Sequence, residues 1–169
     1  MGVLIANESG VASPLDDSEI ADVAAAVLAA EGVERDVEVS VTLVDDERMR
    51  GLNAAWRGID APTDVLSFEC DSPADEGIPE DETLELGDIV LAPRVIAAQA
   101  PAFGMSEVEE FRIMLVHGML HLLGYDHLDD AEAEVMEAHE LAILRRLAEL
   151  RGENPKQVKL GPTTRHRDD

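Results

Sequence analysis

The sequence predicts a single α/β (α+β) domain, in which about five helices pack on a small sheet of about four strands, mixed but mostly parallel. Stretches with strand and helix periodicity alternate along the first half of the chain, and three helical stretches follow. The 169 residues suffice for one domain with a sizeable core and are too few for two ordinary domains. Two predicted strands are joined by coil without a crossover helix, so at least one strand pair should be antiparallel.

The first half of the chain supplies two helices and one strand. A helix of about fourteen residues begins near Ser18 and carries an apolar stripe that faces the core. Valine and leucine alternate with polar residues over 37–43, which is the period of a half-buried strand. Asp45 or Asp46 can cap a second helix, which ends at Arg57.

Two further strands and a short helix follow. The strands are predicted at residues 65–68 and 84–91, and the Pro, Gly and acidic residues of 71–83 favour a solvated loop between them. These two strands form the pair that we expect to be antiparallel. Proline suits the first turn of a helix, so a short helix should begin at Pro93.

Two long helices complete the predicted domain. Ser106 and Glu109 form a capping-box pattern, which opens a helix over the histidine-rich stretch. A last helix covers about 130–150, with Val, Met and Leu on its buried side. We therefore assign residues 1–150 to one domain. Residues 151–169, which are polar and punctuated by Pro and Gly, are predicted to form a flexible tail.

The chain is strongly acidic, with 37 Asp and Glu against 13 Lys and Arg and a net charge of −24. Residues 1–150 hold eight basic against 34 acidic residues, whereas 151–169 hold five against three. This balance is unusual for a protein that binds a polyanion, because phosphate contacts normally dominate nucleic-acid affinity. The uneven distribution nevertheless leaves room for a local basic strip.

The single cysteine, Cys70, excludes an intrachain disulfide and fits a reducing compartment. We interpret it as a small buried apolar residue rather than a nucleophile, because no histidine lies at a spacing that would pair with it. The N-terminal residues lack the basic and apolar segments of a signal peptide, and no apolar stretch approaches the roughly 18 residues of a membrane span. We therefore expect a cytoplasmic protein without a membrane partner.

Three histidines between positions 117 and 127 have the spacing of ligands to one metal ion. His117 and His121, four residues apart on a helix, project from the same face with Cβ atoms about 5–6 Å apart. Gly124 can adopt the left-handed conformation that ends a helix and can turn the chain so that His127 reaches the same ion. Three imidazoles without a fourth protein ligand are typical of a catalytic zinc site. The sequence therefore predicts one Zn²⁺ per chain.

The same spacing occurs in the extended zinc-protease signature H-E-x-x-H-x-x-G-x-x-H, so the predicted histidine helix is zincin-like. In those proteases the Glu is the general base, and in this chain its position is Gly118. Glycine cannot take a proton from a metal-bound water, so the motif lacks a peptidase base.

Three ordered motifs together resemble the bacterial YbeY family of rRNA-maturation endoribonucleases. They are HGMLHLLGYDH at 117–127, NAAWRGIDAPTDVLSF at 53–68 and LGDI at 86–89, within a region of similarity over roughly 35–150. The resemblance implies a YbeY-like, single-strand-specific, metal-dependent endoribonuclease that acts in 16S rRNA 3′-end maturation and ribosome quality control. The implied partners are single-stranded RNA, 16S rRNA and the ribosome or its small subunit, with no DNA.

By motif position, the resemblance implies that His117, His121 and His127 are metal ligands and that Arg57 is functionally important. An arginine at the end of a helix could also serve only to face the helix dipole. A guanidinium nevertheless suits a phosphate, because it donates two parallel hydrogen bonds. Asp126 could accept a hydrogen bond from a ligand imidazole, although exposure to solvent is an equal alternative.

Several other polar residues receive structural interpretations. Ala92 departs from the family pattern, which often has a hydroxyl residue there, and this affects a helix cap rather than the site. His139 and His166 have no partner at ligand spacing and are excluded as ligands. Residues interpreted as turn formers rather than catalytic groups are Asp60, Thr63 and Asp64.

The resulting hypothesis is hydrolysis of phosphodiester bonds in single-stranded RNA, with the metal polarising a phosphoryl oxygen or activating water and Arg57 stabilising the developing charge. The sequence assigns no general base. Two alternatives stay open: a metallopeptidase with metzincin-like spacing, and a non-catalytic ribosome-assembly factor whose metal only braces the fold.

Overall fold

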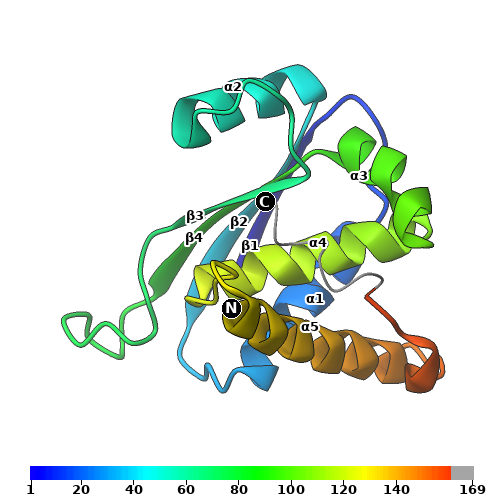
Figure 1. Ribbon diagram of the computed structural model, residues 1–169. Coiled ribbons are helices and arrows are strands. Elements are labelled where there is room, and N and C mark those ends of the chain that lie inside the picture. The colour runs from blue at the N-terminus through cyan, green and yellow to red at the C-terminus, as the bar shows by residue number, and fades with distance from the viewer. Residues whose placement is uncertain (161–169) are drawn as a thin grey trace.

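Figure 1 shows the fold as a computed structural model, in which residues 1–160 are described. The chain begins with a strand, β1, that the sequence did not predict; from α1 onward the order helix, strand, helix, two strands and a helical remainder follows the prediction. The elements in chain order are β1 (Gly2–Glu8), α1 (Asp17–Ala30), β2 (Val37–Val44), α2 (Asp46–Arg57), β3 (Val65–Glu69), β4 (Leu84–Leu91), α3 (Pro93–Gln99), the 3-10 turn η1 (Ala100–Phe103), α4 (Glu107–Leu122), α5 (Asp130–Leu150) and the 3-10 turn η2 (Pro155–Gln157).

The four strands form one sheet in the order β1-β2-β4-β3. β1 runs parallel to β2 and β2 parallel to β4, whereas β3 runs antiparallel to β4, with Ser67 opposite Ile89. The predicted fold class is confirmed, and so is the antiparallel pair. A coil connection without a crossover helix can join two neighbouring strands only when they run in opposite directions.

No pattern in the sequence singles out β1. The strand lies at the edge of the sheet, where Val3 and Ile5 pack against the core and Leu4 is 60% exposed. Its backbone is held by pairing with β2, from Gly2 opposite Glu38 onward. An edge strand of this kind depends on a ladder with a distant partner, which local periodicity does not reveal.

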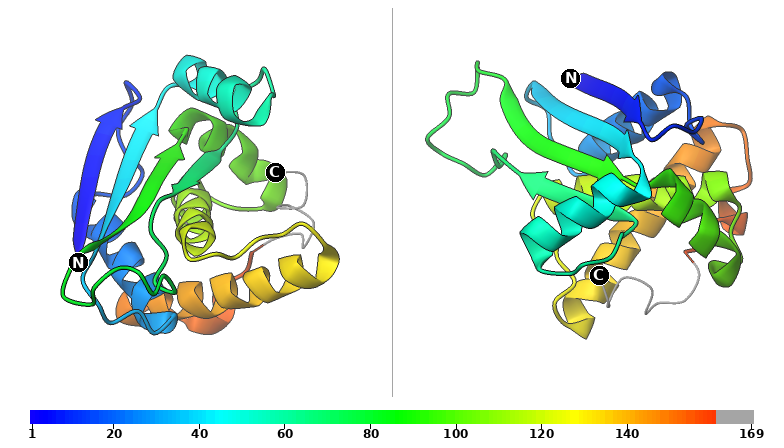
Figure 2. Two further views of the ribbon diagram at one scale, coloured as in Figure 1. Left: turned by 90° about the vertical axis from the view of Figure 1, so that its left-hand side faces the viewer. Right: turned by 90° about the horizontal axis from the view of Figure 1, so that it is seen from above.

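Helices cover both faces of the sheet (Figures 1 and 2), and the apolar core on one face is much larger than that on the other. α2 lies alone on one face, over a small apolar cluster formed by Met49 with residues of β2, β3 and β4. α1, α4 and α5 lie on the other face, over the main core. The alternation of burial along β2 reflects this difference between the faces. Its residues at 37, 39, 41 and 43 are buried in the main core, and those between them, on the other face, are only half-buried.

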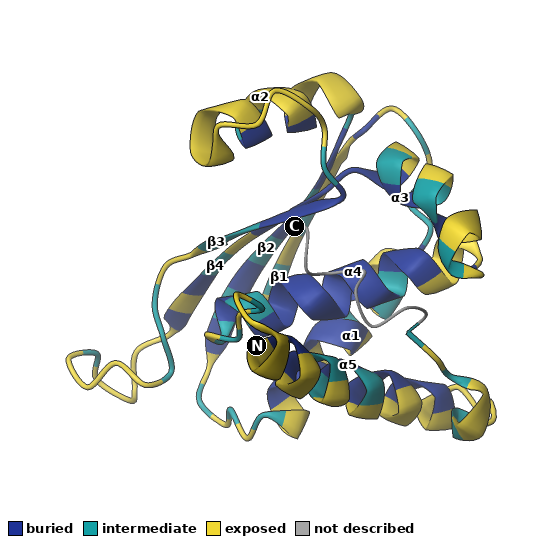
Figure 3. Ribbon diagram, viewed as in Figure 1, coloured by how far each residue is buried: buried dark blue, intermediate teal, exposed yellow. Residues whose placement is uncertain are grey.

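The histidine helix α4 is the most deeply buried helix of the described chain, whereas α2 is largely exposed (Figure 3). The predicted capping box begins it: the Ser106 hydroxyl accepts from the backbone N–H of Glu109, and the Glu109 carboxylate accepts from the N–H of Ser106. Near its end, Gly118 lies against the sheet, and its carbonyl accepts a hydrogen bond from the Ser67 hydroxyl at 3.1 Å. The helix can approach β3 this closely because residue 118 has no side chain.

Beyond α5 the predicted tail begins with the turn η2, and Val158 and Leu160 pack against the main core. Residues 161–169 lie outside the described part of the chain. None of the helices in residues 1–160 combines the length and the apolar character needed to cross a membrane.

The close approach at Gly118 can be tested by substitution. A Cβ atom there would lie 2.9 Å from Cγ2 of the buried Ile89, so Gly118→Ala must displace the sheet. We expect a net loss of about 1–2 kcal/mol in the free energy of unfolding, because overpacking outweighs the gain in helix propensity. Gly51→Ala in α2 is the matched control, since its Cβ would meet no atom within 4 Å. Urea denaturation should show Gly51→Ala slightly stabilised, and equal effects at both positions would contradict the packing argument.

Candidate metal centre

The structure brings the three predicted histidines together. His117 and His121 lie one turn apart at the end of α4, and His127 returns from the loop that follows. Each offers one ring nitrogen to a common point, and these three nitrogens lie within 4.8 Å of one another. The Nε2 atoms of His117 and His121 are 3.0 Å apart. Two nitrogens bound tetrahedrally to one zinc ion would be about 3.3 Å apart, so the geometry fits a shared ion.

Gly124 turns the chain as the sequence predicts. Its φ of +99° lies in the left-handed region, which is strained for residues with a Cβ. The turn is closed by hydrogen bonds from Gly124 N to His121 O (3.0 Å) and from Tyr125 N to Leu120 O (3.1 Å). The reversal therefore satisfies the last carbonyls of α4 while it directs His127 back toward the helix.

Hydrogen bonds at Nδ1 orient two of the imidazoles. The Nδ1 of His121 lies 2.9 Å from the carbonyl oxygen of Tyr125, which can only accept, so this nitrogen carries the proton. The Nδ1 of His117 lies 3.0 Å from Oε1 of Glu140, a fully buried carboxylate of α5. In both rings the Nε2 atom then presents its lone pair to the centre, which is the tautomer that a metal requires.

Burial and the neighbouring histidines lower the pKa of His121 from 6.5 to about 4. Burial is the larger cause, and the proximity of His117 and His127 adds to it. The imidazole is therefore neutral at pH 7, which is the form that can donate its lone pair to a metal.

Arg57 lies on the rim of the same pocket. A depression of about 300 Å³ is lined by the three histidines, by Arg57, by Asp126 and Leu128, and by Val65, Leu66 and Ser67 of β3. Arg57 ends α2, which covers the opposite face of the sheet from α4 (Figure 1), so the pocket is lined by residues from both sides of the sheet. Its position beside the histidines is consistent with the predicted role.

The loop after Arg57 is held by polar contacts that are structural. Arg50 forms a bidentate ion pair with Asp60 at 2.7 and 3.0 Å, and the buried Asn53 donates to the carbonyl of Ala61 at 2.8 Å. Asp64 accepts from the backbone N–H of Val65 and from the amide of Gln99. These bonds agree with the interpretation of Asp60 and Asp64 as turn formers.

The structure also bears on the interpretations of Cys70 and Asp126. Cys70 is exposed, so its prediction as a buried apolar residue is wrong. It lies just beyond β3, where its backbone N–H still donates to the carbonyl of Leu86 in β4, and the adjacent Asp71 raises the pKa of its thiol. Asp126 accepts from the backbone N–H of His127 at 2.8 Å and therefore braces the loop. His166 lies outside the described residues.

Two groups that the sequence analysis missed orient the centre: Glu140 and Tyr125. Glu140 had one detectable signal, because it stands four residues after Met136 and four before Leu144, on the apolar side of its helix. A carboxylate on a buried stripe needs a partner, and here the partner is His117. The carbonyl of Tyr125 left no such signal, since any residue type carries one.

The side chain of Tyr125 anchors the histidine loop to two distant helices. Its hydroxyl donates to Oε2 of Glu31, just after α1, at 2.7 Å, and Oε1 of the same carboxylate lies 2.7 Å from Nδ1 of His139 on α5. Burial and Glu31 raise the pKa of Tyr125 to about 12, so the phenol stays protonated and donates. His139, which is excluded as a metal ligand by its spacing, thus belongs to a hydrogen-bonded network with Tyr125 and Glu31 behind the metal centre.

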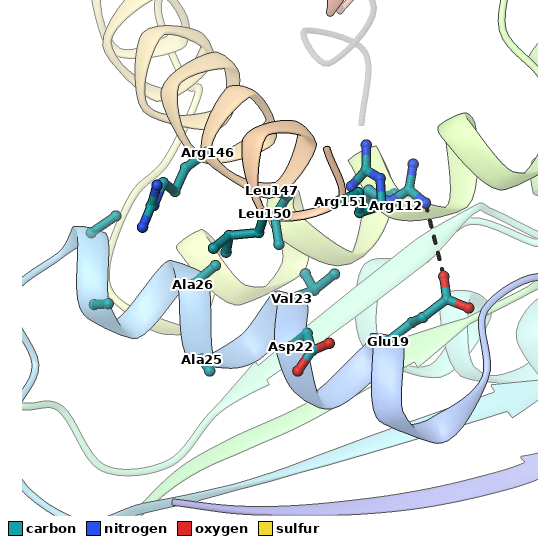
Figure 4. A pocket seen from close by; sticks show the side chains of 12 residues that line it. Glu19, Asp22, Val23, Ala25, Ala26, Arg112, Arg146, Leu147, Leu150 and Arg151 are labelled. Atoms are coloured by element: carbon teal, nitrogen blue, oxygen red, sulfur yellow. Dashed lines mark ion pairs between the residues drawn. The ribbon is translucent and has the colours of Figure 1, made fainter. Parts of the chain in front are cut away.

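A larger cavity of about 730 Å³ lies between α1 and the C-terminal part of α5 (Figure 4). Its walls combine apolar side chains, such as Val23 and Leu147, with three arginines. Each arginine has an acidic partner: Arg112 with Glu19 at 4.0 Å, Arg146 with Glu149 at 3.1 Å and Arg151 with Glu153 at 2.9 Å. Within residues 1–160 the only group of three potential metal ligands is the histidine cluster, so we place the chemistry in the smaller pocket.

Comparisons with known proteins agree on one family. Residues 5–148 match the family model described as Endoribonuclease YbeY. A Legionella pneumophila protein named Endoribonuclease YbeY is 41% identical over 155 residues, covering 92% of this chain and 93% of its own. A Halorhodospira halophila protein of the same name is 48% identical over 110 residues, covering 65% and 70%. The solution structure of TM1509 from Thermotoga maritima shares the fold, with a TM-score of 0.58, 24% identity and coverage of 95% and 99%.

The hydrogen-bonded network of Tyr125, Glu31 and His139 can be tested with Tyr125→Phe. This substitution keeps the ring and removes the hydroxyl bonded to Glu31. We expect zinc affinity to fall by up to about tenfold, because groups that orient ligands tune metal binding. A competition titration with a chromophoric chelator would measure this. Glu31→Gln should weaken binding similarly, and the double variant should add little, since both changes break one network. Unchanged zinc affinity in both single variants would show that the network does not act on the centre.

Proposed function

The chain belongs to the Endoribonuclease YbeY family, and from this and the geometry of the centre we propose that it is a metal-dependent endoribonuclease. Its substrate is single-stranded RNA, cleaved by hydrolysis of a phosphodiester bond. The observation that carries the proposal is the convergence of three imidazoles and one arginine on a single pocket. Metal ligands and a phosphate-binding cation are the two elements that metal-assisted phosphodiester cleavage requires.

His117, His121 and His127 are the ligands in this proposal, and Zn²⁺ is the metal. The donor set fits zinc, since three imidazoles with no carboxylate oxygen among them match a borderline-soft ion of tetrahedral preference. When bound, the ion supplies Lewis-acid polarisation of a phosphoryl oxygen or of water. Glu140 and the Tyr125 carbonyl hold the proton on Nδ1 of His117 and His121, so both Nε2 atoms stay available as donors.

Arg57 is the group that we assign to the substrate phosphate. Arg57 lines the pocket from the end of α2, and two of the ligands line it from α4, so a phosphate bound in the pocket can be contacted from both elements. Charge that develops on the phosphoryl oxygens during cleavage is then stabilised by a permanent cation. We further propose that the RNA is 16S rRNA during 3′-end maturation and quality control on the small ribosomal subunit, in line with the YbeY-like motifs.

The metallopeptidase alternative has a specific obstacle. A side chain at residue 118, where zinc proteases carry their general base, would begin 2.9 Å from Ile89 and 3.3 Å from Val65 and Ser67. Position 118 therefore faces the sheet, and the helix has no room there for a carboxylate aimed at the centre. The second alternative, a metal that only braces the fold, predicts that metal removal destroys structure rather than cleavage.

Metal removal tests the proposal directly. Chelation should abolish cleavage of single-stranded RNA while the circular-dichroism spectrum stays folded, and added Zn²⁺ should restore cleavage. His127→Ala should lower zinc content with little effect on the fold, because His127 lies in the loop between α4 and α5. Stoichiometric zinc in His127→Ala would remove this residue from the ligand set. Undiminished cleavage after complete chelation would refute metal dependence.

Arg57 is tested by two substitutions. Arg57→Lys should impair RNA cleavage nearly as much as Arg57→Ala, because an ammonium cannot reproduce the two parallel hydrogen bonds of a guanidinium. We expect a loss of about 10²- to 10³-fold in kcat, the range seen when one donor to a developing oxyanion is removed. Arg48→Ala, on an exposed part of α2, is a suitable control. Zinc content should be unchanged in all three variants, and wild-type cleavage in Arg57→Ala would exclude Arg57 from the site.

A further inference from the structure

An endoribonuclease must bind RNA, which is a polyanion, and this protein is strongly acidic. The inference drawn from this conflict rests on the proposed endoribonuclease function. The net charge is −24, and within residues 1–160 Arg57 is the only arginine or lysine that lines the histidine pocket. Phosphate contacts supply most of the affinity of ordinary nucleic-acid-binding proteins. Here they must be few, so a non-electrostatic contact is needed to hold the substrate.

Trp56 is the side chain best placed to make that contact. It precedes Arg57 in the last turn of α2 and is 69% exposed, an unusual position for the largest apolar side chain. It is also the only tryptophan in the chain. Consecutive Cα atoms are about 3.8 Å apart, and neighbouring side chains of a helix diverge by about 100°, so the indole and the guanidinium leave one turn in different directions and can contact adjacent parts of one strand.

The Trp56 indole is held on one side by an aromatic residue of the sheet. The Phe68 ring of β3 packs against Trp56 edge to face, with ring centroids 5.4 Å apart and an angle of 64° between the planes. Ser67 lines the histidine pocket, whereas Phe68, the next residue of β3, faces the cluster under α2, because successive strand residues point to opposite faces. Trp56 therefore rests on the α2 face of the edge strand that borders the centre. An aromatic group that is fixed on one side and exposed on the other is already organised for stacking.

We propose that Trp56 stacks on a nucleobase of the single-stranded RNA whose phosphate contacts Arg57. Stacking does not depend on charge, so it can hold a polyanion on an acidic protein, and it tolerates any base because each has a π face. It also favours single strands, since bases within a duplex are already stacked on their neighbours. Loss of one such contact should weaken RNA binding roughly 5- to 150-fold.

The intrinsic fluorescence of the wild-type, zinc-loaded protein reports on this contact directly, because Trp56 is its only indole. The probe is a short 2′-O-methyl oligonucleotide, whose integrity is checked on a gel after each titration. It should quench the tryptophan emission in a saturable manner. An abasic strand of equal length should leave the emission nearly unchanged, and so should a blunt duplex. Equal quenching by the abasic strand would overturn the proposal, because no base is needed for it.

Variants separate stacking from charge. Fluorescence anisotropy of a labelled oligonucleotide measures the affinity for RNA. Trp56→Leu should lower this affinity roughly 5- to 150-fold and leave the slope of log K against log salt concentration unchanged. Trp56→Phe should recover part of the lost affinity. Arg57→Ala should instead reduce the magnitude of that slope by about 0.7, the contribution of one phosphate contact on a single strand. Leu150→Ala is the control for loss of an exposed apolar side chain, since Leu150 is 62% exposed at the far end of α5.

The outcomes also distinguish the stacking contact from the function on which it rests. If the zinc-loaded wild type does not cleave single-stranded RNA, the proposed function fails. If it cleaves and Trp56→Leu binds and cleaves as the wild type does, the stacking contact is refuted while the endoribonuclease proposal stands. A rise in KM for Trp56→Leu with kcat retained supports a base contact made outside the reacting phosphate.

Discussion

The hydrogen bond between His117 and Glu140 is the constraint around which the histidine side of the domain is organised. Both side chains are almost completely buried, 1% and 0% exposed, and they join α4 to α5 at 3.0 Å. A polar pair in an apolar core is tolerated only when each member satisfies the other. The bond therefore fixes how α5 packs on α4, and it sets the imidazole tautomer that the metal centre needs. Packing and chemistry depend on the same contact.

The remaining parts of the centre come from different layers of the fold. α4 lies under the sheet and supplies two imidazoles, the loop before α5 supplies the third, and α2 on the opposite face supplies Arg57. The pocket that they share is also lined by the edge strand β3, which pairs with β4 on one side. The close approach of α4 at Gly118 brings the histidines up to that edge. The candidate site therefore lies beside the edge of the sheet, and the proposed substrate, a long and flexible single strand, suits such a position.

The charge distribution fits such a site. Glu31 and Glu140 stand behind the histidines and accept hydrogen bonds, whereas Arg57 lines the pocket and Trp56, the residue before it, is exposed to solvent. Carboxylates placed behind neutral ligands fix their orientation without meeting the substrate. In the proposed complex, an RNA strand that approaches this acidic protein contacts a cation at Arg57 and an aromatic surface at Trp56.

The sequence by itself determined the fold class, the capping box of α4, the antiparallel pair and the histidine cluster, because periodicity, caps and helical spacing are local properties. It also pointed to Arg57, through a motif, without showing that it shares a pocket with the histidines. The tertiary structure alone decided the edge strand β1, the exposure of Cys70 and the roles of Glu140 and Tyr125. These features rest on contacts between segments far apart in the chain, such as Glu31 with Tyr125, and local periodicity carries no information about distant partners.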